Sequence, residues 1–166
     1  MKKPDKLLIG IVSSVILLVV IAFAVALLRP KATYQSEDSP DGVAFNYLFA
    51  LQQRDYERAY GYLLPSIRGY PRTSEAFVDD IRNYSWSFNE LESVSTTLEV
   101  ESANLNGKRA EVKMKETRFY EGGLFDSRQY TNFFTITLRQ GEDGAWKIEE
   151  ADSYWLWCWN EFGGCK

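Results

Sequence analysis

The sequence predicts an α+β protein in which an N-terminal transmembrane helix precedes about three helices packed on a curved antiparallel sheet. An uncharged apolar run fills residues 7–28. Apolar residues then recur at helical spacing from residue 40 to 84, and they alternate with polar residues beyond residue 90. Helices first and strands afterwards indicate α+β rather than alternating α/β units. We expect an anchor at 1–29, a linker at 30–39, the folded domain at 40–157 and a tail at 158–166.

The apolar run from Leu7 to Leu28 has the length of a membrane span, roughly 33 Å at about 1.5 Å per residue. A cleaved signal peptide is the alternative, because Ala22-Phe23-Ala24 has the small-x-small pattern of a cleavage site. The run continues past that site to Leu28, which favours a retained anchor. No cysteine lies near its end, which excludes a bacterial lipoprotein.

The basic residues around the run predict its orientation. Lys2, Lys3 and Lys6 precede it, and Arg29 and Lys31 are followed by acid-rich sequence. The positive-inside bias therefore places the N-terminus in the cytoplasm. We expect a single-pass plasma-membrane protein whose C-terminal domain is periplasmic or extracellular.

Composition excludes several functions. The chain has no histidine, which removes imidazole-based catalysis and most zinc or iron sites. Residues 32–166 carry 14 basic and 22 acidic side chains, and this acidic field disfavours nucleic acid. We expect no metal and no cofactor.

Three helices are predicted after the linker. Ser39 and Pro40 fit the N-cap and first position of one helix, and its apolar face is Ala44, Tyr47, Leu48 and Leu51. A second helix begins at Asp55 and ends before Pro65. A third begins at Thr73 or Ser74 and presents Phe77, Ile81 and Tyr84 on one side.

Strands follow, separated by turn sequences. Asn106-Gly107 is a hairpin signal, Gly122-Gly123 marks a second turn, and Gly141 to Gly144 marks a third. The inward-facing positions of these strands are apolar and alternate with polar ones: Val94, Thr96, Leu98, Val100; Ala110, Val112, Met114; Phe134, Ile136, Leu138; and Trp146, Ile148.

Cys158 and Cys165 are predicted to form a disulfide. Gly163-Gly164 supplies flexibility for a tight closure, and an exported domain meets oxidising conditions. The spacing matches neither a redox nor a zinc motif. Free thiols are the alternative.

The order of elements and two motifs resemble the nuclear transport factor 2-like superfamily. One motif runs from Ala44 to Tyr60, where a helix ends, Asp55 begins the next and Ala59-Tyr60 packs inward; the other runs from Glu142 to Ile148. The resemblance covers residues 40–155. It implies a cone whose curved sheet leaves a pocket at one end. Members of the superfamily include isomerases, dehydratases, cyclases and binding or assembly modules.

Continuing the inward parity of the strands gives candidate pocket residues: Glu116, Arg118 and Tyr120; Arg128, Tyr130 and Asn132; Glu150 and Asp152. A carboxylate in a dry pocket can act as a general base, with Tyr130 donating to an oxyanion. Glu116, Glu150, Asp152 and Tyr130 are thus the catalytic candidates. The alternatives are a solvated sheet end, or an ion network of Glu116, Arg118 and Glu150. A β-bulge would shift the parity by one residue.

The segment from Tyr154 to Trp159 is unusually aromatic. On an extended strand Trp155, Trp157 and Trp159 would share one side. They would then either cover the core or form an exposed patch that docks on a partner or a bilayer interface. Arg118 and Tyr130 join these three tryptophans as binding candidates.

These features favour a membrane-tethered binding or assembly domain, an accessory subunit of a membrane protein complex, over an enzyme. Its expected partners are the membrane, through Leu7 to Leu28, and a protein; a small apolar ligand is a further expectation. A lyase or isomerase that uses the pocket carboxylates is the alternative.

Overall fold

The structure, a computed structural model, describes residues 6–28, 32–88, 91, 96–121 and 127–165. It divides into two compact units, Met1–Thr33 and Tyr34–Lys166. The first unit contains helix α1 (Lys6–Leu27), and the second contains all the other elements. The predicted turn at Gly122-Gly123 and the strand residue Val94 lie outside the described residues.

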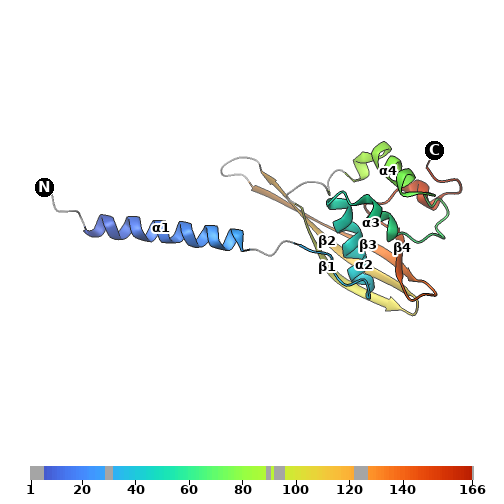
Figure 1. The fold of residues 1–166 in the computed structure, drawn as a ribbon, viewed down its shortest axis with the longest axis horizontal. Coiled ribbons are helices and arrows are strands. Elements are labelled where there is room, and N and C mark those ends of the chain that lie inside the picture. Colours follow the sequence, from blue (N-terminus) through green and yellow to red (C-terminus); the bar gives the residue numbers. More distant parts are fainter. Residues whose placement is uncertain (1–5, 29–31, 89–90, 92–95, 122–126, 166) are drawn as a thin grey trace. The chain divides into compact units, whose positions relative to one another are not determined.

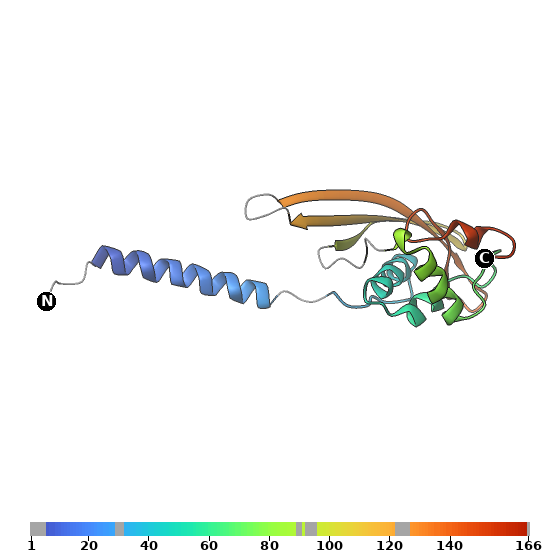
Figure 2. The same cartoon turned by 90° about the horizontal axis from the view of Figure 1, so that it is seen from above.

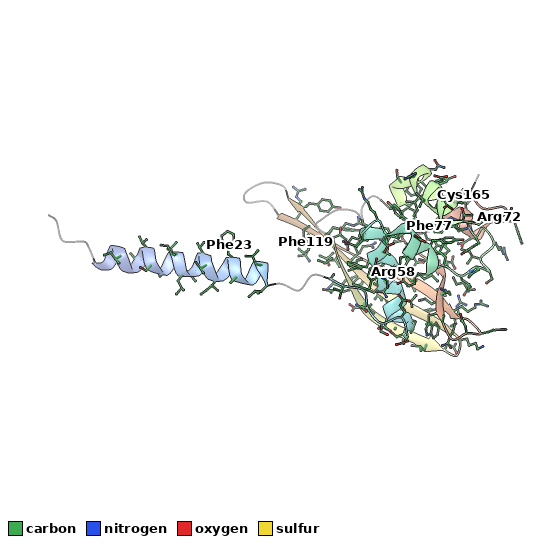
Figure 3. The ribbon with its side chains drawn as sticks, in the orientation of Figure 1. Phe23, Arg58, Arg72, Phe77, Phe119 and Cys165 are labelled. Carbon is green, nitrogen blue, oxygen red and sulfur yellow. A yellow bond between two sulfur atoms is a disulfide. The ribbon has the colours of Figure 1, made fainter. Side chains whose placement is uncertain are left out.

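Helix α1 presents apolar side chains to its surroundings, among them Leu18, 66% exposed, and Phe23, 65% exposed. Phe23 projects from the helix in Figure 3. Among the described residues, however, no helix is long and apolar enough to cross a membrane. The expected transmembrane span is therefore not supported by the structure.

Three helices of the second unit lie on one face of its sheet (Figure 2). They are α2 (Pro40–Gln52), α3 (Tyr56–Gly61) and α4 (Ser74–Asn83). Their N-caps are those predicted, since the side chains of Ser39, Asp55 and Thr73 each accept a hydrogen bond from a backbone N–H of the first turn. Two short 3-10 helices, η1 (Ser85–Ser87) and η2 (Trp157–Asn160), complete the helical elements among the described residues.

Within the described residues the sheet has four antiparallel strands in the order β1-β2-β3-β4 (Figure 1). The strands are β1 (Thr96–Asn106), β2 (Arg109–Glu121), β3 (Ser127–Gln140) and β4 (Trp146–Ala151). Gly107 in the first hairpin turn has φ +61°, a conformation that glycine adopts at little cost. The α+β class, the meander and the described part of the alternation are confirmed.

Helix α2 is buried on all sides rather than along one face. Its predicted stripe is buried and the helix contacts the sheet. The chain that enters the domain contacts Asn46 and Phe49 of the helix. The Asn46 amide, fully buried, binds both backbone groups of Gln35: its Oδ1 accepts from the N–H at 2.7 Å, and its Nδ2 donates to the carbonyl at 2.9 Å. The core therefore lies between the sheet and the helices, and α2 contributes many of its residues.

Helix α3 is shorter than predicted and ends at Gly61, four residues before Pro65. The chain turns there to pair with β4: the N–H of Leu64 donates to the carbonyl of Ile148, and the N–H of Ile148 donates to the carbonyl of Tyr62, both at 2.8 Å. These bonds hold the helices against the far edge strand.

Candidate functional site

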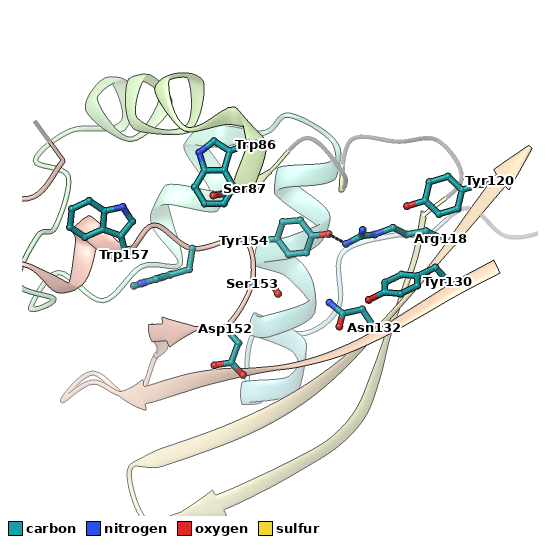
Figure 4. Close-up of a pocket in the computed structure, with 11 residues that line it drawn as sticks. Trp86, Ser87, Arg118, Tyr120, Tyr130, Asn132, Asp152, Ser153, Tyr154 and Trp157 are labelled. Carbon is teal, nitrogen blue, oxygen red and sulfur yellow. Dashed lines mark hydrogen bonds between the residues drawn. The ribbon is translucent and has the colours of Figure 1, made fainter. Parts of the chain in front are cut away.

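A pocket of about 750 Å³ lies at one end of the sheet, between the ends of β2 and β3 and the C-terminal segment (Figure 4). Its walls come from four parts of the chain. The lining residues are Trp86, Ser87, Arg118, Tyr120, Tyr130, Asn132, Asp152, Ser153, Tyr154, Trp155 and Trp157.

Regular pairing of β2 with β3 brings the predicted inward residues together. Glu116 lies opposite Asn132, Arg118 opposite Tyr130, and Tyr120 opposite Arg128. Directly opposed residues share one face of a sheet, so all six point to the helix side. Tyr130 and Asn132 are among the described residues that line the pocket, and Arg128 on the same strand is not.

Glu116 is the centre of a buried polar cluster beside the pocket. Its carboxylate is fully buried and accepts from Arg118 with both oxygens, Nε to Oε1 at 2.9 Å and Nη2 to Oε2 at 2.8 Å. The Tyr154 hydroxyl donates to Oε1. It also accepts from Arg118 Nη2 at 3.3 Å, the bond drawn in Figure 4. Buried charges are tolerated when they are paired and hydrogen-bonded in this way.

The pKa values of the partners follow from this geometry. The hydrogen bond to Glu116 raises the pKa of the Arg118 guanidinium above its ordinary value. Burial, and then the bond to Glu116, raise the pKa of the Tyr154 phenol, so it stays protonated. The cluster is therefore a fixed ion pair with a neutral phenol, as the ion-network alternative anticipated for Glu116 and Arg118.

Tyr154 reaches Glu116 because its backbone is left-handed, with φ +59°. That conformation is uncommon for a residue with a Cβ, and tertiary contacts hold it. The fully buried Tyr47 of α2 donates its hydroxyl to the Tyr154 carbonyl at 2.7 Å. The Tyr154 ring packs edge-on against Phe134, with centroids 5.6 Å apart. No sequence motif indicates this conformation, so the role of Tyr154 could not be predicted.

Glu150 does not face the pocket, contrary to prediction. A bulge in β4 pairs Leu138 with Ile148 but Thr137 with Glu150, and this extra residue reverses the parity beyond it. Glu150 lies on the outer face and accepts from Asn160 Nδ2 at 3.1 Å. It therefore takes no part in the ion network.

Asp152 lies at the edge of the pocket, below Tyr154 in Figure 4. The Thr135 backbone N–H donates to its Oδ2 at 3.0 Å. It is exposed. Of the described residues that line the pocket, it is the only acidic one. Of the candidate bases, it alone is in the pocket wall.

The three tryptophans of the C-terminal segment do not share one side, because β4 ends at Ala151 and Trp157 begins the 3-10 helix η2. Trp159 is fully buried, stacks on Phe77 and donates its indole N–H to Asp80 at 2.9 Å. Trp155 is 9% exposed and packs edge-on against Trp159. Trp157 is 63% exposed and lines the pocket. Trp159 is thus a core residue.

The predicted disulfide joins Cys158 to Cys165, with Cα atoms 5.0 Å apart. It links Cys158 within η2 to the end of the tail, and so holds the element that carries Trp157.

The compact unit includes this tail and begins at Tyr34, within the expected linker.

Sequence reasoning missed the opposite wall of the pocket. Trp86 and Ser87 come from η1, and Trp86 is 71% exposed. A tryptophan between two serines, in Ser85-Trp86-Ser87, was the available signal, because an apolar ring in a polar segment often serves a surface role.

No protein-family model matches the chain, and no curated protein matches it. Solved structures do. A SEC-C motif containing protein from Rhodopseudomonas palustris is 19% identical, with a TM-score of 0.48 over 72% of this chain and 81% of that one. A ketosteroid isomerase-like protein from Erwinia carotovora atroseptica is 11% identical, with a TM-score of 0.48 over 72% and 95%.

A nuclear transport factor 2-like superfamily protein from Salmonella enterica serovar Typhimurium is 12% identical, with a TM-score of 0.44 over 70% of this chain and 89% of that one. Structural similarities this weak concern only the course of the backbone, and they give no information on the residues of the site. The structural neighbours thus include proteins of the superfamily that the sequence resembles.

Proposed function

We propose that this chain is a membrane-tethered, extracytoplasmic binding domain rather than an enzyme, and that it binds through the pocket between η1, η2 and the ends of β2 and β3. In this role it presents a bound small organic ligand to a membrane protein complex as an accessory subunit.

The observation that carries the binding role is the state of Glu116. Its two oxygens are held by Arg118 and Tyr154, and the group is fully buried. A general base needs a free carboxylate within reach of the substrate proton. Glu116 is instead a structural ion-pair partner, which fixes Arg118 and Tyr154 in the pocket wall.

The makeup of the pocket also suits binding. Its volume lies in the range of small-molecule sites, roughly 300–1,000 Å³. Aromatic rings at both ends supply contact area, and hydroxyl, amide and carboxylate groups between them supply orientation (Figure 4). The hydrogen bonds that hold Arg118 and Tyr154 in place reduce the cost of ordering these two side chains on binding.

The tether rests on the sequence: an uncharged run from Leu7 to Leu28 flanked by basic residues. The described side chains of α1 are apolar and exposed, and such a helix is stable only in lipid or against another apolar surface. Among the described residues no helix is long and apolar enough to cross a membrane, and attachment through this run is therefore tested directly.

Membrane attachment is tested by comparing the full-length chain with a chain that begins at Thr33. We expect the full-length chain in the membrane pellet after an alkaline carbonate wash, and the shortened chain in the supernatant. A reporter enzyme active only outside the cytoplasm, fused after Lys166, checks the side. A full-length chain released by carbonate, or a silent reporter, overturns the tether.

The rival function is a lyase or isomerase with Asp152 as its base. Asp152 is at the pocket edge, and Tyr130 and Asn132, which can donate hydrogen bonds, line the same pocket (Figure 4). Asp152→Asn separates the two functions. Ligand that co-purifies with the gently solubilised protein is identified by mass spectrometry, then incubated with wild type and variant. Recovery of unchanged ligand from both supports binding; conversion by wild type that Asp152→Asn abolishes supports the enzyme.

A further inference from the structure

We infer that the ligand of this pocket is an uncharged glycan, with sugar rings stacked on Trp86 and Trp157 and hydroxyls bound by the polar groups between the aromatic ends. This inference rests on the proposed binding function and adds the chemical class of the ligand.

Tryptophan burial is the first reason. Three of the five tryptophans are buried: Trp146 at 6%, Trp155 at 9% and Trp159 at 0% exposure. The other two, Trp86 and Trp157, are 71% and 63% exposed, and both line this one pocket. Large exposed apolar groups gathered at a single place mark a binding surface.

The two exposed indoles reach the pocket from elements far apart in sequence, η1 and η2 (Figure 4). At the other end stand Tyr120 and Tyr130, 51% and 53% exposed. The pocket thus offers aromatic faces at two ends with a polar stretch between. This suits an extended ligand with more than one ring.

The polar stretch decides against a wholly apolar ligand. Ser87, Asn132, Asp152 and Ser153 all line the pocket. Covering such groups without giving them hydrogen-bond partners is unfavourable, because each loses its bonds to water. A sugar ring has an apolar C–H face that packs on an indole and a rim of hydroxyls that serve as donors and acceptors. The Asn132 amide and the Asp152 carboxylate can bind such hydroxyls in pairs.

Charge decides against an anionic ligand. Arg118 is the cation among the described lining residues, and its charge is matched by the bidentate carboxylate of Glu116. Among the described lining residues, the remaining charge is the negative one of Asp152. A phosphate or carboxylate would therefore meet repulsion here, whereas a neutral polyol would not.

The test is a titration of the full-length protein in detergent with three probes, chitotriose, cellotriose and maltotriose, followed by tryptophan fluorescence and calorimetry. We expect at least one probe to bind. Trp86→Ala and Trp157→Ala should each weaken that binding about tenfold or more, as truncation of a stacking ring does at an interface centre. Both residues are exposed, so the melting temperature should not change.

Phe133→Ala is the matched control. Phe133 is an aromatic residue with 48% exposure on the outer face of the sheet, outside the pocket lining. Its removal should leave glycan affinity as it was. No binding of any probe into the millimolar range, or binding that both tryptophan variants retain in full, overturns the glycan inference.

Two further outcomes of the titration separate the glycan ligand from the binding function. If the three sugars do not bind but choline or a proline-rich peptide does, and Trp157→Ala abolishes that signal, the glycan inference is wrong and the binding function stands. If a sugar is recovered cleaved, and Asp152→Asn prevents the cleavage, glycan recognition stands and the non-enzymatic function is wrong.

Discussion

At the scale of single residues, the buried pair of Glu116 and Arg118 couples stability to the site. The Arg118 side chain is 11% exposed and that of Glu116 is wholly buried. Each charge would be costly alone, because desolvation is offset only by the partner and its hydrogen bonds. The same bonds hold Tyr154 in its left-handed conformation, so the pocket wall depends on the pair.

Glu116→Gln should therefore destabilise the domain by about 3–5 kcal/mol, the cost of leaving a buried charge unpaired. Glu111→Gln, on the same strand but exposed on its outer face, should change stability by less than about 0.5 kcal/mol. Urea unfolding followed by tryptophan fluorescence measures both. Equal midpoints for the two variants would show that Glu116 carries no structural charge pair.

A second carboxylate, Glu37, ties the entry of the chain to α3. Its Oε1 accepts from the Tyr62 hydroxyl at 2.7 Å and from Arg58 Nη2 at 2.8 Å. These bonds lower the pKa of Glu37, with Tyr62 the larger cause. Because the folded pKa lies below the unfolded one, the stabilisation exists above the unfolded value and is lost as pH falls through the folded value.

Unfolding free energies of wild type and Glu37→Gln should therefore differ at pH 7, and the difference should shrink as the pH falls below the ordinary glutamate pKa of about 4.3. The difference should stay below about 1 kcal/mol, since the side chains of Arg58 and Glu37 are 39% and 52% exposed and water screens them. Chemical denaturation at stepped pH measures it. Parallel curves over the whole range would contradict the assignment.

At the scale of elements, the β2–β3 side of the site was predictable and the C-terminal side was not. Unbroken alternation through Met114 and Phe134 sets the parity of Glu116, Arg118 and Tyr130, because regular pairing preserves it. The bulge at Glu150 and the turn at Tyr154 have no local sequence signature. They are imposed by tertiary contacts. The bulge places Glu150 on the outer face of the sheet, and the turn is followed by two buried tryptophans, Trp155 and Trp159, and one exposed, Trp157.

Gly69 fixes where η2 lies. Its N–H donates to the Trp159 carbonyl at 2.8 Å, and a Cβ there would stand 2.2 Å from the Cys158 carbonyl oxygen and 2.8 Å from Trp159 Cα. Both are backbone atoms, so the segment would have to move. The approach is as close as a glycine allows.

Gly69→Ala should cost about 1–3 kcal/mol, as an overpacked core position does. It should also shift the fluorescence of Trp157, because η2 is displaced. Gly61→Ala is the control: nothing lies within 4 Å of a Cβ at this helical glycine, so we expect unchanged or slightly greater stability, by up to about 1 kcal/mol. Thermal unfolding compares the two. If Gly69→Ala melts with the wild type, the close approach does not constrain η2.

At the scale of the whole molecule, two units of opposite character are joined in one chain. The first is an apolar helix whose described side chains are exposed. The second holds the described core, which runs from Val43 to Trp159 and is closed by the disulfide. A domain of this size can bury enough surface to fold alone, and a chain that carries its own core does not need an anchor to be stable.

A chain that begins at Thr33 should therefore fold without the first unit. It retains Tyr34, Gln35 and Glu37, whose bonds to α2 and α3 close the entry side of the core. We expect cooperative unfolding and native near-ultraviolet circular dichroism. A chain that begins at Ala44 removes those bonds and the Ser39 cap, and should unfold at a clearly lower temperature. Should the Thr33 chain lack a cooperative transition while the full-length protein has one, the first unit would be part of the fold rather than an appendage to it.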